Sequence, residues 1–277
     1  MFSVAHKLGW KAELNLCFQN SGDRTVLASR SQSGPLTVQR PFYPEANVCH
    51  LYLLHPPGGV VGGDELHINV QAEEQANVLI TTPGATKFYR NTGLLAQQIQ
   101  TLSVQDDCAL EWFPQENIFF DGTHTHLKTR VELTESARFM GWEINCYGRP
   151  AANEDFVSGK VLTSLEIFRC GQPLLMDRLL IDSPSALQSP SSMNNYPCFG
   201  TFVATHITDA LLETARSALA EIEMPVQIGL TLIDDILVAR CLGNYAEQIS
   251  IPLKCIWAAI RPEVLGRDVC HPRIWST

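Results

Sequence analysis

Short β-prone runs follow one another closely between residues 12 and 181, and no amphipathic helical segment separates them. Such spacing favours stacked sheets that are mostly antiparallel or solenoid-like. No repeat period is regular enough to count solenoid turns. The sequence therefore predicts a mainly β fold, with strands at residues 12–19, 24–29, 48–54, 66–70, 77–82, 96–104, 109–113, 117–120, 128–133, 138–147, 161–169 and 174–181.

The character of the chain changes after residue 182. Residues 183–198 are rich in Ser, Pro and Asn and predict an exposed loop. Residues 199–277 then predict a helix–strand–strand–helix subregion, in which Thr208 is a candidate N-cap and both helices have one apolar face. We expect a single domain over residues 1–277, α+β overall, with a β-rich body at 1–182 and two helices near the C-terminal end.

Composition narrows the function classes. The chain has 29 acidic and 20 basic residues, a net charge of −9, which disfavours a broad nucleic-acid-binding face. No run approaches about 18 consecutive apolar residues, so we expect no membrane span. The nine cysteines form no Cys-x-x-Cys pair and mostly have apolar neighbours, which indicates reduced thiols. With no apolar signal core near the N-terminus, the sequence predicts a cytoplasmic protein.

Residues 55–65 (His-Pro-Pro-Gly-Gly-Val-Val-Gly-Gly-Asp-Glu) predict a loop of defined shape, because two prolines limit φ and four glycines accept positive φ. Asp64 places a carboxylate at the start of the next strand. No Gly-Lys-Ser/Thr follows, so a phosphate loop is not indicated. We interpret the glycines as a structural corner; they are Gly58, Gly59, Gly62 and Gly63.

Three carboxylates lie inside apolar strand sequences: Glu111, Glu143 and Asp177. Acids in such positions either face solvent on one side of the strand or are buried and paired. A second interpretation is a polar lining inside an otherwise apolar body, which holds or conducts a cation. Asp64, beside the glycine corner, is a fourth candidate for this lining.

His124 and His126 form a His-x-His pair, and on a strand both rings point to one face at metal-chelating distance. They are candidate ligands of a minor surface metal site. Two other histidines, His50 and His271, each follow a cysteine directly in the sequence. Adjacent residues of a strand point to opposite faces, so we expect neither Cys-His pair alone to chelate a metal.

Several segments together resemble the urease accessory protein D family. The segments run in the family's order from about residue 10 to the end: residues 38–44, 55–66, 82–90, 110–116, 141–143 with 148–150, and 272–275. The resemblance implies a mostly β fold and no catalytic reaction. It implies a complex with the accessory proteins F and G, expected at 2:2:2 stoichiometry, that docks on apo-urease, where G is the GTPase that carries nickel.

The same resemblance implies an internal passage for nickel. Residues of this chain at the family's polar passage positions are Asp64, Thr86, Glu143 and Asp177. Isolated oxygen ligands suit transport, because a His/Cys cage would trap the ion. We therefore expect no tightly bound cofactor and only transient binding of Ni²⁺.

Two other functions remain open from the residues alone. The first is a metal-dependent enzyme on a β scaffold that uses Asp64, Glu143 and the histidines. The second is an interaction module whose buried acids are only internal ion pairs. An enzyme should present a dense His/Asp/Glu ligand set, whereas these candidates are spread thinly along the chain.

Overall fold

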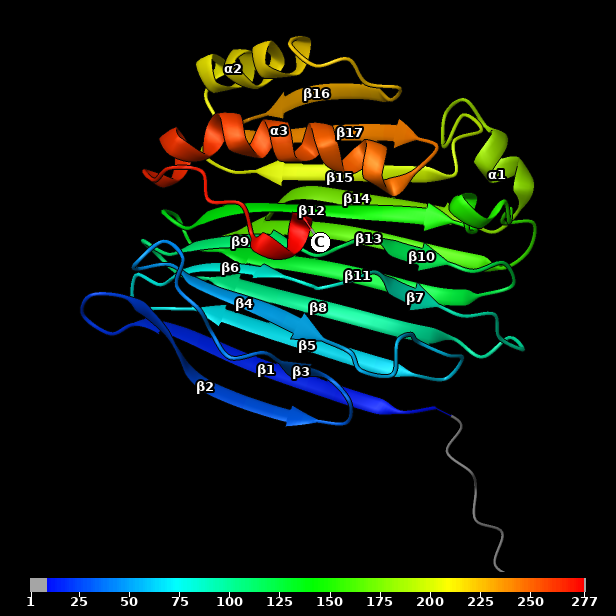
Figure 1. Ribbon diagram of the computed structural model, residues 1–277, viewed down its shortest axis with the longest axis horizontal. Helices are drawn as coiled ribbons and strands as arrows, with labels where there is room; N and C mark the ends of the chain where they lie inside the picture. Colours follow the sequence, from blue (N-terminus) through cyan, green and yellow to red (C-terminus); the bar gives the residue numbers. More distant parts are fainter. Residues whose placement is uncertain (1–8, 277) are drawn as a thin grey trace, which may run out of the picture.

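The computed structural model describes residues 9–276, and two stacked β-sheets make up most of it (Figure 1). The first sheet has seven strands in the order β14-β13-β11-β8-β5-β1-β2. Its strands are β1 (Lys11–Asn20), β2 (Thr25–Ser33), β5 (Glu65–Ala72), β8 (Ala96–Val104), β11 (His124–Leu133), β13 (Lys160–Arg169) and β14 (Gln172–Ile181).

The second sheet has ten strands. Eight follow the order β16-β17-β15-β12-β9-β6-β4-β3, and β10 pairs with both β12 and β7. Its strands are β3 (Thr37–Val38), β4 (Cys49–Leu54), β6 (Asn77–Thr81), β7 (Thr86–Phe88), β9 (Ala109–Phe113), β10 (Asn117–Phe119), β12 (Arg138–Tyr147), β15 (Cys198–Ala204), β16 (Gln227–Ile233) and β17 (Ile236–Gly243).

The centre of the fold is solenoid-like. The chain crosses repeatedly from one sheet to the other, so β1, β5, β8, β11 and β13 are parallel neighbours in one sheet and β4, β6, β9 and β12 in the other. Parallel pairing needs no helical crossover here, because a strand of the opposite sheet makes each return. Antiparallel strands close the ends, as in the pairs β1–β2, β13–β14 and β12–β15. The predicted mainly β fold is confirmed.

The main hydrophobic core lies between the sheets, and alternation of apolar residues along the strands builds it. In β1, for example, Ala12, Leu14, Leu16 and Phe18 are buried in this core. A second core lies between the ten-stranded sheet and the C-terminal helices α2 (Asp209–Ala220) and α3 (Ala246–Leu265). Figure 1 shows both helices on the same face of this sheet.

The sequence predicts two helices near the C-terminal end, and within residues 9–276 the structure has two there, α2 and α3. The hydroxyl of Thr208 accepts a hydrogen bond from the backbone N–H of Leu211 at 3.3 Å, as expected of an N-cap. The Ser-rich segment contains the short helix α1 (Pro184–Gln188), which the loop prediction did not include. Two 3₁₀ turns, η1 (Pro150–Ala152) and η2 (Arg273–Ser276), complete the elements.

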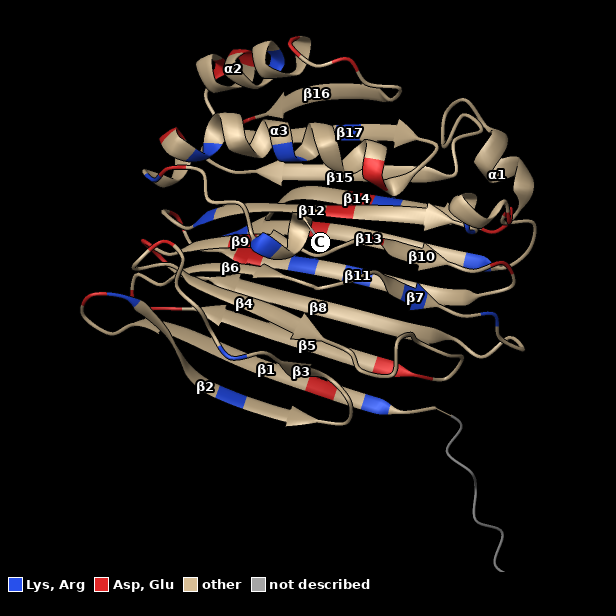
Figure 2. Cartoon of the chain, viewed as in Figure 1, with Lys and Arg blue, Asp and Glu red and all other residues tan. Residues whose placement is uncertain are grey.

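Charged residues lie mainly in the loops and at isolated positions along the strands, and long stretches of strand carry none (Figure 2). None of the helices within residues 9–276 combines the length and the hydropathy that a bilayer crossing requires. The carboxylates buried inside the fold are therefore exceptions that need a physical explanation.

Candidate functional site

Glu143 is the central residue of the candidate site. It lies on β12 with Gly141 and Asn145 at the alternate positions, on the face that looks into the space between the sheets, and is only 6% exposed. The hydroxyl of Thr129, on β11 of the opposite sheet, donates a hydrogen bond to its Oε1. Glu143 therefore connects the two sheets through a polar contact inside the main core.

Burial raises the pKa of Glu143 to about 7. Hydrogen bonds from Thr129 and Asn145 oppose this rise, and the negative charge of Asp177 adds to it. A carboxyl group with a pKa near neutrality exchanges its proton readily at physiological pH. It can therefore be an oxygen ligand in one state and a neutral hydrogen-bonding group in the other.

A cavity of about 260 Å³ extends from the loops at one end of the sheets to Glu143. Around it lie the glycine corner, the segment before β7, and Thr86 at the start of β7. Its polar interior lining is largely buried and comes from both sheets: Gln98, Gln100, Asn117 and Glu143. Gln100 donates to Thr129 at 3.3 Å, so Gln100, Thr129 and Glu143 form one hydrogen-bonded chain.

A smaller cavity of about 20 Å³ lies on the other side of Glu143, and Asp177 lines it. This volume is close to the minimum that holds one water molecule. Glu143 is the residue that the linings of the two cavities share. The seven-stranded sheet supplies Gln100, Thr129, Leu165 and Asp177 from directly paired positions of neighbouring strands, so these side chains face the same side.

Asp177 marks the far end of this arrangement. It lies on the edge strand β14, and Arg240 of β17 donates to its Oδ2 with an Nη2–Oδ2 distance of 2.9 Å. The pair joins the edge strand of the seven-stranded sheet to β17, the second strand of the ten-stranded sheet. Because Arg240 already neutralises the carboxylate, a cation gains the full charge of Asp177 only when this ion pair opens.

Asp64 has a different environment. Its Oδ1 accepts a hydrogen bond from the backbone N–H of Trp10 at 2.8 Å, and its Oδ2 accepts one from that of Val61 at 2.9 Å. It is 6% exposed and is not among the residues that line the two cavities at Glu143. The geometry gives Asp64 a structural task, which is to attach the glycine corner to the beginning of β1.

The glycine corner is tightly packed, as a structural corner requires. A Cβ on Gly59 would lie 2.3 Å from Cε2 of Tyr89, and one on Gly62 would lie 2.6 Å from Cβ of Asn91. Gly63 has φ of +92° and Gly58 has φ of +80°, in the region that favours glycine. Gly58 and Gly59 also line the larger cavity, so the corner shapes its wall.

His124 and His126 occupy alternate positions of β11, as the His-x-His spacing predicts. Nδ1 of His124 lies 3.2 Å from the carbonyl oxygen of Gly93. Burial and the charges of Lys128 and Arg178 lower the pKa of His126, which keeps its imidazole neutral. Within residues 9–276, the group of three His, Cys, Asp or Glu side chains at metal-binding separation includes neither histidine. The metal site at this pair stays a prediction.

Glu111 is buried and paired rather than solvent-facing. Arg261 of α3 donates to both of its oxygens, and the indole N–H of Trp257 donates to its Oε1 at 2.6 Å. Arg261 also binds Glu45, which in turn contacts His50 at 2.6 Å. The apolar context of Glu111 was the only sequence signal for this network, because its partners lie far away in the chain.

The comparison with known proteins decides the family. The sequence model described as "UreD urease accessory protein" matches residues 11–276. The chain belongs to this family. It is 49% identical to the urease accessory protein UreD of Alcanivorax borkumensis over 98% of this chain and 94% of the relative. The corresponding protein of Aliivibrio fischeri is 45% identical, with 97% of each chain covered, and that of Klebsiella aerogenes is 42% identical, with 98% of each covered.

Membership of the UreD family confirms the resemblance seen in the sequence. It assigns the chain a role in urease maturation and confirms the prediction of an accessory protein rather than an enzyme. The cavities that meet at Glu143 are therefore features of an accessory protein. The question is then which cargo these cavities hold or pass on.

Proposed function

We propose that this chain passes nickel toward apo-urease through the polar space between its two sheets. The observation that carries the proposal is the position of Glu143, which lines the cavities on both of its sides. The proposed route runs from Thr86 at the start of β7, past Gln98 and Gln100, to Glu143 and then to Asp177.

The chemistry of the lining suits a cation in transit. Amide, hydroxyl and carboxylate oxygens are weak, hard ligands compared with thiolates and imidazoles, so an ion keeps part of its water and leaves easily. Among the residues around the larger cavity, His55 and Glu143 are the ionisable ones. So sparse a set of strong ligands favours transport over a resident metal or a hydrolytic centre.

The small cavity beside Glu143 gives the proposal a mechanism. A space of about 20 Å³ is too small for a hydrated ion, so passage requires side chains to move and water to be shed. The ionised carboxylate of Glu143 replaces water ligands that the ion loses. Because the pKa of Glu143 is about 7, the ionised fraction, and with it this replacement, depends on pH. Opening of the Asp177–Arg240 pair then frees the exit.

The proposal places the chain in the cytoplasm, in a complex with the accessory proteins F and G that docks on apo-urease. Family membership supports contact with urease and other accessory proteins. The resemblance of the whole chain to the family, described above, is the basis for naming F and G and for a 2:2:2 stoichiometry. Nickel is the cargo of this complex, bound transiently.

The test uses cells that lack the wild-type gene and carry Glu143→Gln together with Asp177→Asn. We expect pull-down with apo-urease and the accessory proteins to match wild type, and the nickel content of purified urease to fall at least tenfold. Glu166→Gln is the matched control, because Glu166 is a buried carboxylate on β13 that pairs with Lys128 at 2.8 Å, on the opposite face from the passage.

Normal nickel content in the double variant would contradict the passage and leave the chain as a scaffold. Loss of the complex together with nickel would also count against it, since the two acids would then be needed for assembly. A loss of nickel in Glu166→Gln of the same size would show that any buried acid has this effect.

A further inference from the structure

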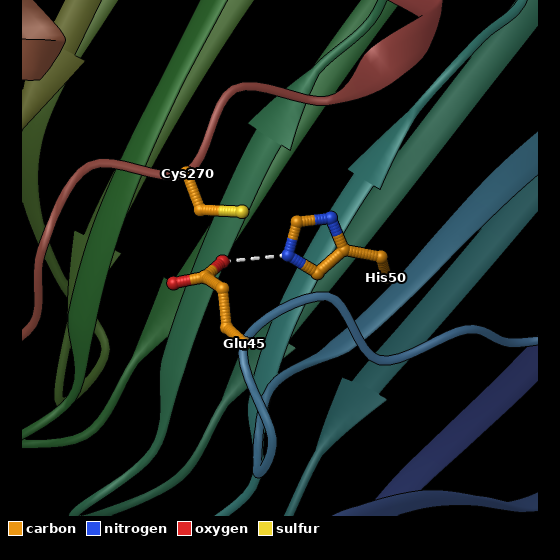
Figure 3. Close-up of side chains that lie close together, drawn as sticks. All are labelled: Glu45, His50 and Cys270. Atoms are coloured by element: carbon orange, nitrogen blue, oxygen red, sulfur yellow. Dashed lines mark hydrogen bonds and ion pairs between the residues drawn. The ribbon is translucent and has the colours of Figure 1, made fainter.

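Three potential metal ligands from distant parts of the sequence converge on the outer face of the ten-stranded sheet. They are Glu45 in the loop before β4, His50 on β4, and Cys270 in the segment after α3. Figure 3 shows the carboxylate, the imidazole and the thiol pointing toward one another. Their ligand atoms all lie within 4.8 Å of each other, and among residues 9–276 this is the group of three that meets this criterion.

The separations fit a tetrahedral ion after small side-chain movements. With metal–ligand bonds of about 2.0–2.3 Å, ligand atoms around a tetrahedral ion lie about 3.3–3.8 Å apart. The Nε2 of His50 and Oε1 of Glu45 are now 2.6 Å apart, joined by a hydrogen bond. An ion that replaces the shared proton needs this pair to open by about 1 Å. Half-buried Cys270 leaves a side from which solvent can supply a fourth ligand.

The local charge also favours a cation. Arg261 pairs with both Glu45 and Glu111. The charge of the half-buried Arg267 also acts on Glu45 and Glu111, so two guanidinium groups balance the two carboxylates. Deprotonation of the Cys270 thiol then leaves one negative charge at the ligand group, which a bound cation offsets.

The imidazole of His50 is held in place for such a role. Its ring is fully buried, and Nε2 points into the group. Within the described part of the chain, Nδ1 is buried and has no hydrogen-bond partner. Its polar interaction is therefore the one with Glu45, inside the group, and the ring of Phe42 packs beside it at 5.5 Å.

We propose that Glu45, His50 and Cys270 bind one divalent transition-metal ion of the zinc type. A thiolate, an imidazole and a carboxylate form a mixed ligand set that suits Zn²⁺ and excludes Mg²⁺ and Ca²⁺. The site is separate from the proposed nickel route. On β4, Cys49, Leu51 and Leu53 face the core between the sheets, so His50 faces the opposite side.

The ion ties the C-terminal segment to the sheet. Beyond Cys270, Trp275 packs against the rings of Trp142 and Trp257 at 5.0 and 5.3 Å and donates to Thr81 at 3.2 Å. A metal bond at Cys270 holds the start of this segment on β4, and the Trp275 contacts hold its end. Metal binding should therefore protect the segment after α3 from proteolysis.

The experiment uses the full chain, fused to a cysteine-free carrier protein, stripped with a chelator and reloaded with Co²⁺ as a probe for Zn²⁺. A Co–thiolate bond produces sulfur-to-cobalt charge-transfer absorption in the near ultraviolet. We expect this band in wild type, its loss in Cys270→Ser, and at least tenfold weaker Co²⁺ binding in His50→Gln. Zn²⁺ should displace the Co²⁺ and slow cleavage of the C-terminal segment.

Cys255→Ser is the matched control, because Cys255 is also half-buried but lies in α3 with Ala218 as its partner. It should keep the band. Circular dichroism confirms that each variant is folded, and Cys270→Ser changes one atom of a half-buried side chain. Absence of the band in wild type, or its persistence in Cys270→Ser, would overturn the site. Urease is not needed for this assay, so its outcome is independent of the nickel passage.

Discussion

Arg261 and Glu111 form a two-point ion pair with both side chains buried, although 150 residues separate them in the sequence. Nε and Nη2 of the guanidinium lie 2.9 Å from Oε1 and Oε2 of the carboxylate. Glu111 comes from β9 of the ten-stranded sheet, and Arg261 comes from α3. The pair thus fixes the C-terminal helix on the sheet at a defined position and orientation.

Breaking this pair should destabilise the fold strongly. Arg261→Met leaves Glu111 buried without its counter-ion, and we expect a loss of about 3–5 kcal/mol in the free energy of unfolding. Chemical denaturation of the purified fusion protein measures it. The control is Arg216→Met, which removes an exposed pair with Glu213 on α2 and should change stability by less than about 1 kcal/mol. Equal losses in both variants would contradict this role for the buried pair.

Glu143 should make stability fall with rising pH. Its pKa is raised from 4.5 to about 7 in the folded protein, so between these values the folded state binds more protons than the unfolded state. The contribution of Glu143 to the free energy of unfolding is therefore most favourable below about pH 4.5, decreases toward pH 7 and is least favourable above it.

Glu143→Gln removes this dependence and tests the raised pKa. The variant should gain stability relative to wild type as pH rises from 5 to 8, and the difference should level off above the pKa of about 7. Denaturant midpoints across this pH range measure the difference. A constant difference at every pH would show that Glu143 ionises normally.

Asp64 should matter for stability rather than for nickel. Asp64→Ala removes the acceptor for the backbone N–H groups of Trp10 and Val61, and hydrogen bonds to a charged acceptor are each worth about 1.5–3 kcal/mol. We expect faster hydrogen exchange at these two amides and a lower unfolding temperature. If Asp64→Ala keeps wild-type stability but stops nickel delivery, Asp64 belongs to the passage instead.

Two glycines that line the larger cavity offer a matched comparison. Gly59→Ala places a Cβ 2.3 Å from Tyr89 and 2.8 Å from the carbonyl oxygen of Lys87, so backbone must move. Gly84→Ala meets no atom within 4 Å. We expect the first to reduce the unfolding temperature by several degrees, about 1–3 kcal/mol of strain, and the second to have little effect. An unchanged unfolding temperature in Gly59→Ala would contradict the tight packing of the glycine corner.

Local features of the fold were predictable from neighbouring residues. Alternating apolar residues in β1 and the Thr208 cap of α2 follow from contacts within one strand or one turn. The position of Glu143 in an apolar strand marked it as unusual before its surroundings were known. In contrast, the helix α1 was missed, because a single helical turn leaves no periodic pattern to detect.

The sequence by itself determined most of the strands, but not β3, β7 or β15. It also determined the C-terminal helices, the family and the acids that stand in apolar surroundings. Only the tertiary structure decided which of these acids are paired, which line a cavity, and which meet other ligands. Glu45 and His50 meet Cys270 only after α3 has folded back across the ten-stranded sheet. Such contacts depend on how distant strands pair and in which register, and no pattern of neighbouring residues contains that information.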